Sequence, residues 1–355
     1  MVVTFSRDGY VKRTPLDTYR AQGRGGRGVK GSESKEGDVI SSVFVAGTHD
    51  YVLCFSNLGK VYWLKVYQIP EGSRTSRGRA IRNLLELADG EKIRSLLRVP
   101  SFDQEAFVVF ATKGGTVKKT ALEAYSRPKK VGIRAIALDE DDEVVDVSLA
   151  EPGDTVLIAS ATGRAVRFDE AAARAMGRVS RGVRGMRLRE GDAVVSMVVL
   201  SGGQNEGLTL VTACEHGYGK RTPADDYPIK GRGGQGVINI KVTERNGKVV
   251  SVRPCTDKDD LLLISTSGMM VRIEAVDARP MGRNTQGVRL VNLKDDDVLA
   301  GVEVVKAEDI EFAARSGAGT VEAGDGAPLA AVPTDEVEDA GVDEEPEAED
   351  DETEE

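Results

Sequence analysis

The chain has 355 residues, of which 40% are apolar, so it can bury a large core as one β domain or as two ordinary domains. Its formal charge of −10 is unevenly distributed, because 19 acidic residues and one basic residue, Arg315, follow residue 306 and leave a charge of +8 on residues 1–306. Three dispersed cysteines and two histidines indicate neither a disulfide framework nor a zinc site, and no run of about 18 apolar residues is present to span a membrane.

These features predict a protein of the reducing cytosol without a membrane span or a secretion signal. Met1 leads directly into a β-branched run, which suggests that the chain is a fragment of a longer protein. Residues 307–355 are acidic and rich in Ala, Gly and Pro, so we expect them to be disordered. This tail is either a solubilising extension or an intramolecular competitor that covers basic loops when no external polyanion is bound.

Six copies of one unit precede the tail. Each copy opens with an apolar, β-branched run that ends at a first glycine, and a second glycine follows 19 residues later, or 18 in the third copy. The first glycines are Gly9, Gly59, Gly114, Gly163, Gly217 and Gly268. The second glycines are Gly28, Gly78, Gly132, Gly182, Gly236 and Gly287.

The runs on either side of each first glycine predict a β-hairpin, and two further β runs follow, which makes about four strands in each unit. Radial repetition of such a unit predicts an all-β, propeller-like disk, with an elongated β-solenoid as the alternative. The predicted domain covers residues 1–306, with blades at about 1–50, 51–105, 106–154, 155–207, 208–260 and 261–306. Residues 169–176 (DEAAARAM) predict a short helical insertion.

The segment Gln22-Gly23-Arg24-Gly25-Gly26-Arg27-Gly28 predicts a loop with exposed backbone, because glycine loses the most conformational freedom when it is ordered. Its arginines and Lys30 are cations suited to phosphate oxygens, so the expected partner is a polyanion, and a solvated turn is the alternative. The glycine pattern also satisfies G-x-G-x-x-G. No apolar helical period follows it, which argues against a dinucleotide-binding fingerprint.

Basic residues precede the second glycine in most units and therefore occupy one position in the repeat, whereas acidic turns occupy another. The sequence thus predicts a ring of cationic loops, with an ordinary mixed-charge surface as the alternative. The candidate contacts to the polyanion are Lys12, Arg13, Arg20, Gln22, Arg24, Arg27, Lys30, Arg74, Arg77, Arg79, Lys118, Lys119, Lys129, Lys130, Arg134, Arg178, Arg181, Arg184, Lys220, Arg221, Lys230, Arg232 and Arg283, with the loop glycines Gly23, Gly25, Gly26 and Gly28.

Lysines and arginines on such loops bind phosphate and do not read bases, so we expect steep salt dependence and little sequence specificity. The basic segments contain few aromatic residues on which bases could stack. Double-stranded DNA is therefore the predicted partner.

Residues 1 to about 305 resemble the C-terminal domain of the A subunit of bacterial DNA gyrase. The specific sign is that family's seven-residue box, usually Gln-Arg-Arg-Gly-Gly-Lys-Gly, which stands here at residues 22–28 with Gly23 in place of an arginine and Arg27 in place of a lysine. The resemblance implies a six-bladed β-pinwheel, in which neighbouring blades exchange strands. It also implies right-handed wrapping of DNA around a basic rim, for which Gln22, Arg24 and Arg27 are needed, so that the holoenzyme introduces negative supercoils.

The resemblance further implies two protein partners in the cytoplasm at the nucleoid, which are the remainder of the A subunit, and the B subunit of an A2B2 holoenzyme. The family's catalytic tyrosine, magnesium-binding carboxylates and ATP site lie in other domains or subunits, so we expect no cofactor and no catalysis in this chain. The alternatives are the corresponding domain of the C subunit of topoisomerase IV, which generally lacks the box, and a protein-interaction β-propeller. A propeller hydrolase is disfavoured because His49 and His216 lie far apart in the repeat.

Overall fold

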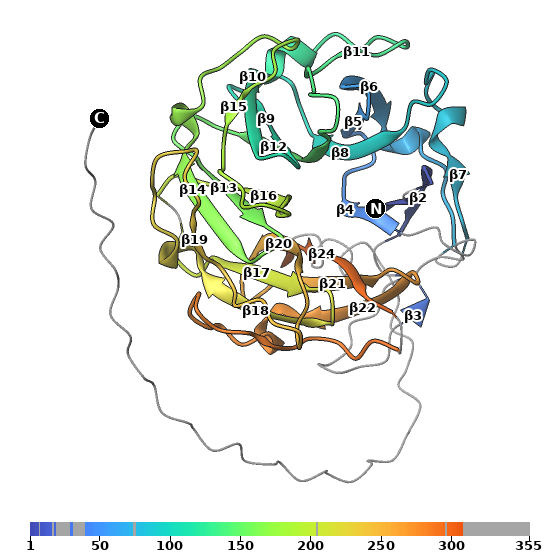
Figure 1. The fold of residues 1–355 in the computed structure, drawn as a ribbon. Coiled ribbons are helices and arrows are strands. Elements are labelled where there is room, and N and C mark those ends of the chain that lie inside the picture. The colour runs from blue at the N-terminus through green and yellow to red at the C-terminus, as the bar shows by residue number, and fades with distance from the viewer. Residues whose placement is uncertain are drawn as a thin grey trace, which may run out of the picture. The chain divides into compact units, whose positions relative to one another are not determined.

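The computed structural model describes residues 1–6, 8–15, 18, 29–30, 40–73, 76–203, 205–294 and 297–307. The chain divides into two units, residues 1–318 and 319–355, and every described residue belongs to the first. The described elements are strands and short 3-10 turns, and the strands form six four-stranded sheets arranged as blades of a propeller-like ring (Figure 1). Within these ranges, no helix has the length and apolarity needed to cross a bilayer.

Each blade is built on an antiparallel hairpin that carries the apolar run and the first glycine, as the alternation of β runs and glycine turns predicts. Hydrophobic residues are buried on both faces of these strands, because each blade packs between two others. The hairpins are β1 (Val2–Ser6) with β2 (Tyr10–Thr14), β5 (Tyr51–Ser56) with β6 (Lys60–Lys65), β9 (Phe107–Thr112) with β10 (Thr116–Ala121), β13 (Thr155–Ser160) with β14 (Arg164–Asp169), β17 (Thr209–Cys214) with β18 (Tyr218–Pro223), and β21 (Asp260–Ser265) with β22 (Met269–Glu274).

A third strand pairs with the first strand of each hairpin and lies on the inner side of the ring (Figure 1). The register shifts at the same place in all six of these pairings, next to the last residue of the hairpin's first strand. The inner strands are β4 (Ile40–Val45), β8 (Ile93–Val99), β12 (Val144–Ala150), β16 (Val194–Leu200), β20 (Val249–Cys255) and β24 (Leu299–Val305).

The fourth strand of each blade is two residues long and comes from another repeat. β7 (Arg79–Ala80), β11 (Ile133–Arg134), β15 (Val183–Arg184), β19 (Val237–Ile238) and β23 (Val288–Arg289) each pair with the outer hairpin strand of the preceding repeat. β3 (Val29–Lys30), from the first repeat, pairs with β22 of the last repeat and so closes the ring. The predicted strand number is confirmed, and the exchange matches the pinwheel that the resemblance implies.

The second glycine permits this exchange. Gly236 has φ +75°, and a Cβ at this position would lie 2.3 Å from the carbonyl oxygen of Ala165 in the preceding blade. A side chain would therefore have to push the exchanged strand off its partner, and its backbone would be strained as well. A Cβ at Gly78, Gly182 or Gly287 would meet a backbone carbonyl of the preceding repeat in the same way, whereas at Gly132 it would meet the Tyr62 ring.

Replacing Gly236 with alanine is expected to lower the free energy of unfolding by at least about 1 kcal/mol, because the Cβ meets backbone and φ is positive. Gly231→Ala is the matched control. Gly231 lies in the same loop with an ordinary φ, and nothing lies within 4 Å of the added Cβ. Thermal unfolding of the two variants checks the prediction, and equal melting temperatures would contradict it.

The hydrophobic core lies between blades rather than at one centre. Six clusters of buried side chains each join two adjacent blades. Between the second and third blades, for example, the ring of Phe55 meets that of Phe110 edge-on, with centroids 5.1 Å apart. Each blade is thus held mainly by its neighbours, and this packing sets the outer loops at regular intervals around the ring.

Two details of the repeat differ from the sequence prediction. The prediction of a helical insertion at 169–176 is wrong, since only a 3-10 turn forms there, at Glu170–Ala172. Four other repeats have a 3-10 turn at the same place, at Val66–Gln68, Leu122–Tyr125, Ala224–Asp226 and Ala275–Asp277. In the third repeat, the hairpin glycine is Gly115, with φ +85°, and not Gly114, whose amide instead donates to the Asp142 carboxylate at 2.8 Å.

Candidate nucleic-acid interface

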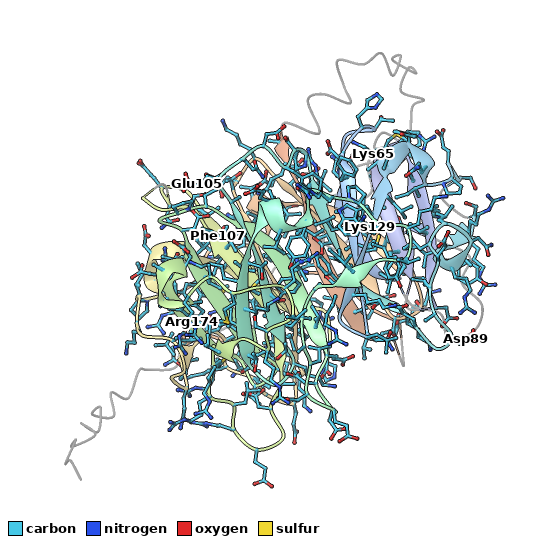
Figure 2. All side chains as sticks on the ribbon, turned by 90° about the horizontal axis from the view of Figure 1, so that it is seen from above. Lys65, Asp89, Glu105, Phe107, Lys129 and Arg174 are labelled. Atoms are coloured by element: carbon cyan, nitrogen blue, oxygen red, sulfur yellow. The ribbon has the colours of Figure 1, made fainter. Side chains whose placement is uncertain are left out.

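Between its 3-10 turn and its exchanged strand, each of the last five repeats runs along the outer strand of the preceding blade. Single backbone bridges mark this path, such as Lys119 with Ala175 and Arg167 with Ile229. We call these segments outer loops 2 to 6, after the repeat that contributes them; they comprise residues 71–78, 126–132, 174–182, 228–236 and 279–287. Figure 2 shows the ring edge-on, with Lys129 on outer loop 3 and Arg174 on outer loop 4.

Outer loops 3 to 6 are connected through backbone hydrogen bonds. The Ala137 amide, just past outer loop 3, donates to Ser180 in outer loop 4 at 3.2 Å. The Gly233 amide in outer loop 5 donates to Gly185, just past outer loop 4, at 2.7 Å. The Lys241 amide, just past outer loop 5, donates to Thr285 in outer loop 6 at 2.9 Å. These four loops therefore form a continuous row along the outer edge.

Of the predicted contacts whose side chains the structure describes, eight are exposed and four are half-buried. The exposed ones are Arg79, Lys129, Lys130, Arg134, Arg181, Arg184, Lys230 and Arg232, and the half-buried ones are Arg13, Arg77, Arg178 and Arg283. Arg181 forms an ion pair with Asp139 at 2.8 Å, but both side chains are more than half exposed, so the pair is weak and Arg181 stays available to an anion. Arg232 also donates to the carbonyl oxygens of Ala172 and Arg184, both at 2.9 Å, and so joins outer loops 4 and 5.

The acidic turns lie at a different place. Their carboxylates accept hydrogen bonds from the hairpin turns of the same repeat, as Asp192 does from the Thr162 hydroxyl at 2.7 Å and Asp297 does from the Ser267 hydroxyl at 2.7 Å. They therefore cap the hairpins at the end opposite to the 3-10 turns, while the cations follow the outer strands. This separation agrees with the sequence, in which the basic segments and the acidic turns occupy different positions in the repeat.

A family model described as "DNA gyrase C-terminal domain, beta-propeller" matches the chain in six segments, residues 1–46, 50–100, 106–151, 154–201, 209–256 and 259–306. The chain belongs to this family. Each matched segment contains one repeat of the structure, and together they cover every outer loop.

Relatives and solved structures agree with the family. The chain is similar to the A subunit of DNA gyrase from Salmonella typhimurium (48% identity) and from Escherichia coli (46%); each alignment covers 88% of this chain. It spans 35% and 36% of the length of these two relatives. A solved DNA gyrase A C-terminal domain has a TM-score of 0.77 at 27% identity and covers 86% of this chain and 99% of its own. The C-terminal domain of a DNA topoisomerase IV has a TM-score of 0.68 at 26% identity, with coverages of 89% and 96%.

Some predicted contacts of this gyrase family domain lie outside the described residues. They are Arg20, Gln22, Arg24, Arg27 and Arg74 and the loop glycines Gly23, Gly25, Gly26 and Gly28. Lys30 is described by its backbone, which pairs with Met269 in the ring-closing strand. The acidic tail beyond Ala307 also lies outside the described residues.

The structure corrects five predicted DNA contacts of this gyrase family domain. Lys12, Lys118, Lys119, Lys220 and Arg221 are at most 5% exposed, so their side chains are not placed to contact DNA directly. All five lie on outer hairpin strands, beneath the outer loop of the next repeat. The Lys119 ammonium pairs with the buried Glu170 carboxylate, and the Arg221 guanidinium donates to the Ala278 carbonyl at 2.8 Å. These two side chains hold 3-10 turns of the following repeat in place.

Several cations that the structure exposes were missed by the sequence prediction. Arg187, Arg189, Lys241 and Arg245 are exposed and lie just past the exchanged strands. The prediction chose residues of the strand after the first glycine and of the segment around the second glycine, and these four cations lie beyond both. Arg245 and Arg289 both approach Tyr218, whose hydroxyl accepts a hydrogen bond from Arg289 at 2.7 Å, and these bonds lower the pKa of Tyr218. This pair of guanidinium groups is a further place on the outer edge where an anion could bind.

Burial of the Lys118 amino group predicts a pH-dependent stability. Desolvation, with a smaller contribution from the charge of Arg178, lowers its pKa to about 7 from 10.5. Between these pH values the unfolded chain binds more protons, so this group makes the fold more stable as pH rises. We expect wild type to gain melting temperature over Lys118→Met between about pH 6 and about pH 9. A difference that stays constant with pH would contradict the lowered pKa.

Proposed function

We propose that this domain binds double-stranded DNA along its outer loops and wraps it around the ring, as the C-terminal domain of a DNA gyrase A subunit. The observation that carries the proposal is the row of outer loops 3 to 6, in which backbone hydrogen bonds fix each loop against the next and exposed cations occur in every loop. A duplex that follows this row meets positive charge at each step. Charge segregation supports DNA over a protein partner, since the carboxylates cap the hairpins instead of interrupting the row.

Several spaced contacts are needed for wrapping. Smooth bending of a duplex costs roughly 1 to 6 kcal/mol for each 20 to 30 bp turned through 40 to 90°. Phosphate contacts release counterions, so the logarithm of affinity falls with the logarithm of salt by roughly 0.9 per phosphate neutralised. Such contacts carry no base information, and binding should depend little on sequence.

Within the holoenzyme, we propose that wrapping presents a crossing segment of the same DNA to the B subunit, and to the remainder of the A subunit, so that negative supercoils are introduced. Strand cleavage, magnesium and ATP hydrolysis then belong to those other parts, and this domain acts without a cofactor in the cytoplasm, at the nucleoid. The relatives named above are gyrase A subunits; they are about three times as long as the matched region, which leaves room for these functions elsewhere.

The test is religation of a nicked circular DNA in the presence of the protein, followed by separation of the topoisomers. We expect a shift in linking number that grows with protein concentration and has the positive sign of a right-handed wrap. Binding without any shift would contradict wrapping and favour a domain that only holds DNA. Absence of salt-dependent DNA binding would favour the protein-interaction propeller.

A further inference from the structure

Three buried lysines hold the backbone of every second outer loop. The Lys118 Nζ donates to the carbonyl oxygen of Arg178 in outer loop 4 at 2.7 Å and to that of Ala135. The Lys220 Nζ donates to Gly282 and Arg283 in outer loop 6, at 2.5 Å and 2.7 Å. These lysines lie in the third and fifth repeats and reach the loop of the next repeat.

Lys12, in the first repeat, completes the set. Its Nζ donates to the carbonyl oxygens of Ser73 and Ser76 in outer loop 2, at 3.2 Å and 2.7 Å. The even-numbered repeats have Tyr62, Val166 and Val271 at this strand position, and lysine is absent there. The lysines therefore act on outer loops 2, 4 and 6, which alternate around the ring.

A carbonyl that points inward turns the following amide outward, because a trans peptide places its C=O and N–H on opposite sides. The amides of Arg77, Val179, Arg283 and Asn284 follow carbonyls that lysine holds, so they point away from the buried amino groups. None of these four amides donates to a protein acceptor in the described part of the chain. The Val179 side chain is 65% exposed, which shows that this turn faces solvent.

The remaining outer loops use their amides differently. In outer loop 5, the Lys230 amide donates to Arg167 at 2.8 Å and the Gly233 amide to Gly185 at 2.7 Å, so both are satisfied within the protein. In outer loop 3, the Gly132 amide donates to the Lys129 carbonyl at 3.0 Å. The Tyr62 ring lies beneath Gly132, and Tyr62 occupies the strand position at which the first, third and fifth repeats have lysine. Peptides whose carbonyl oxygen is held by a buried lysine, and whose amide is thereby turned outward, thus occur in outer loops 2, 4 and 6.

Each of these amides has an arginine beside it. Arg178 and Arg181 flank Val179, and Arg283 carries one of the outward amides itself. In outer loop 2, the Arg77 guanidinium stacks 3.6 Å over the Tyr10 ring, and its buried Nε has no hydrogen-bond partner. A guanidinium group next to an outward amide is suited to an anion that supplies oxygens to both.

We propose that the outward amides of outer loops 2, 4 and 6 bind phosphate groups of DNA, and that Lys12, Lys118 and Lys220 are positioning residues that present them. This inference rests on the proposed function. It adds backbone contacts in outer loops 2, 4 and 6 to the side-chain cations of the described outer loops. Since an amide carries no net charge, the added affinity depends less on salt than the counterion release of the side chains does.

The direct test removes one amide N–H and keeps its carbonyl oxygen, which becomes a somewhat weaker acceptor for Lys118. In the full chain, Val179 is replaced by 2-hydroxyisovaleric acid, which keeps the side chain and turns the amide into an ester. We expect affinity for a linear duplex to fall about tenfold, the loss of one hydrogen bond to a charged acceptor, with the salt slope unchanged and only a small fall in melting temperature. The same substitution at Val131 is the control, because that valine is 64% exposed but lies in outer loop 3, which no lysine supports. Little change is expected there.

The positioning role is tested by combining the ester with Lys118→Met. If Lys118 presents the amide, the ester at position 179 has little further effect in the Met variant. Equal losses at positions 179 and 131, no loss at 179, or a full additional loss in the Met variant would overturn the inference. Should Lys118→Met not fold, the comparison of positions 179 and 131 decides alone. Wild-type protein that fails to shift linking number would instead contradict the proposed function.

Discussion

Replacing all seven residues from Gln22 to Gly28 with alanine is expected to abolish the linking-number change that the domain imposes on a nicked circle. The replacement removes Arg24 and Arg27, and with them the phosphate-binding cations of the box. In the sequence the box directly precedes β3 (Val29–Lys30), which pairs with β22 and so joins the first and last repeats. A wrapped duplex must pass this point to complete its path.

The fold should survive this change, because Gln, Gly and Arg supply no apolar side chain to a core. Melting temperature and affinity for a short linear duplex are the companion measurements, and both should change little relative to the loss of wrapping. Arg27→Lys, which restores the residue usual in the family, is the control and should wrap as wild type does. An alanine variant that still shifts linking number would show that the box is not required here.

Neutralising four cations of outer loops 3 and 4 is expected to weaken DNA binding by roughly a thousandfold at about 0.1 M salt. The variant is Lys129→Gln, Lys130→Gln, Arg181→Gln and Arg184→Gln, all at exposed positions. If each side chain neutralises one phosphate, the slope of log affinity against log salt falls in magnitude by up to about 3.6. Fluorescence anisotropy with a labelled duplex at several salt concentrations gives both quantities.

A matched control removes the same charge elsewhere. Lys92, Lys113, Lys248 and Lys258 are exposed and lie on turns outside the outer loops. Changing these four to glutamine alters the net charge by the same amount, and we expect the salt slope to stay close to that of wild type. Equal slopes for the two variants would mean that DNA responds to overall charge and does not follow the outer edge.

The repeat could be read from the sequence because two glycine positions recur for steric reasons. The first glycine allows the hairpin turn, and the second lets a strand approach the neighbouring backbone, as Gly236 does at Ala165. Each constraint falls on a single residue type at a single position, so each can be recognised in the sequence. The exchange itself leaves almost none, since the exchanged strands are two residues long and their partners belong to another repeat.

Burial of the cations on the outer hairpin strands could not be read in the same way. In a strand with one face in water, successive side chains point alternately to the core and to the solvent, so the alternation of apolar and polar residues shows which positions are buried. In β10 (Thr116–Ala121), Val117, Lys118, Lys119 and Thr120 are all buried, because the blade is covered on both faces and at its outer edge. Two adjacent lysines therefore look like a surface pair in the sequence and are internal supports in the fold.

By itself, the sequence determined the six-fold repeat, the all-β class and the phase at which positive charge recurs, because these depend on residue types at fixed spacings along the chain. The tertiary structure decided which cations face outward and which hold the next loop from beneath, because that depends on the outer loop of one repeat lying over the strand of another. The same contact turns a lysine into a support and leaves a backbone amide facing outward, where we propose that it donates to phosphate.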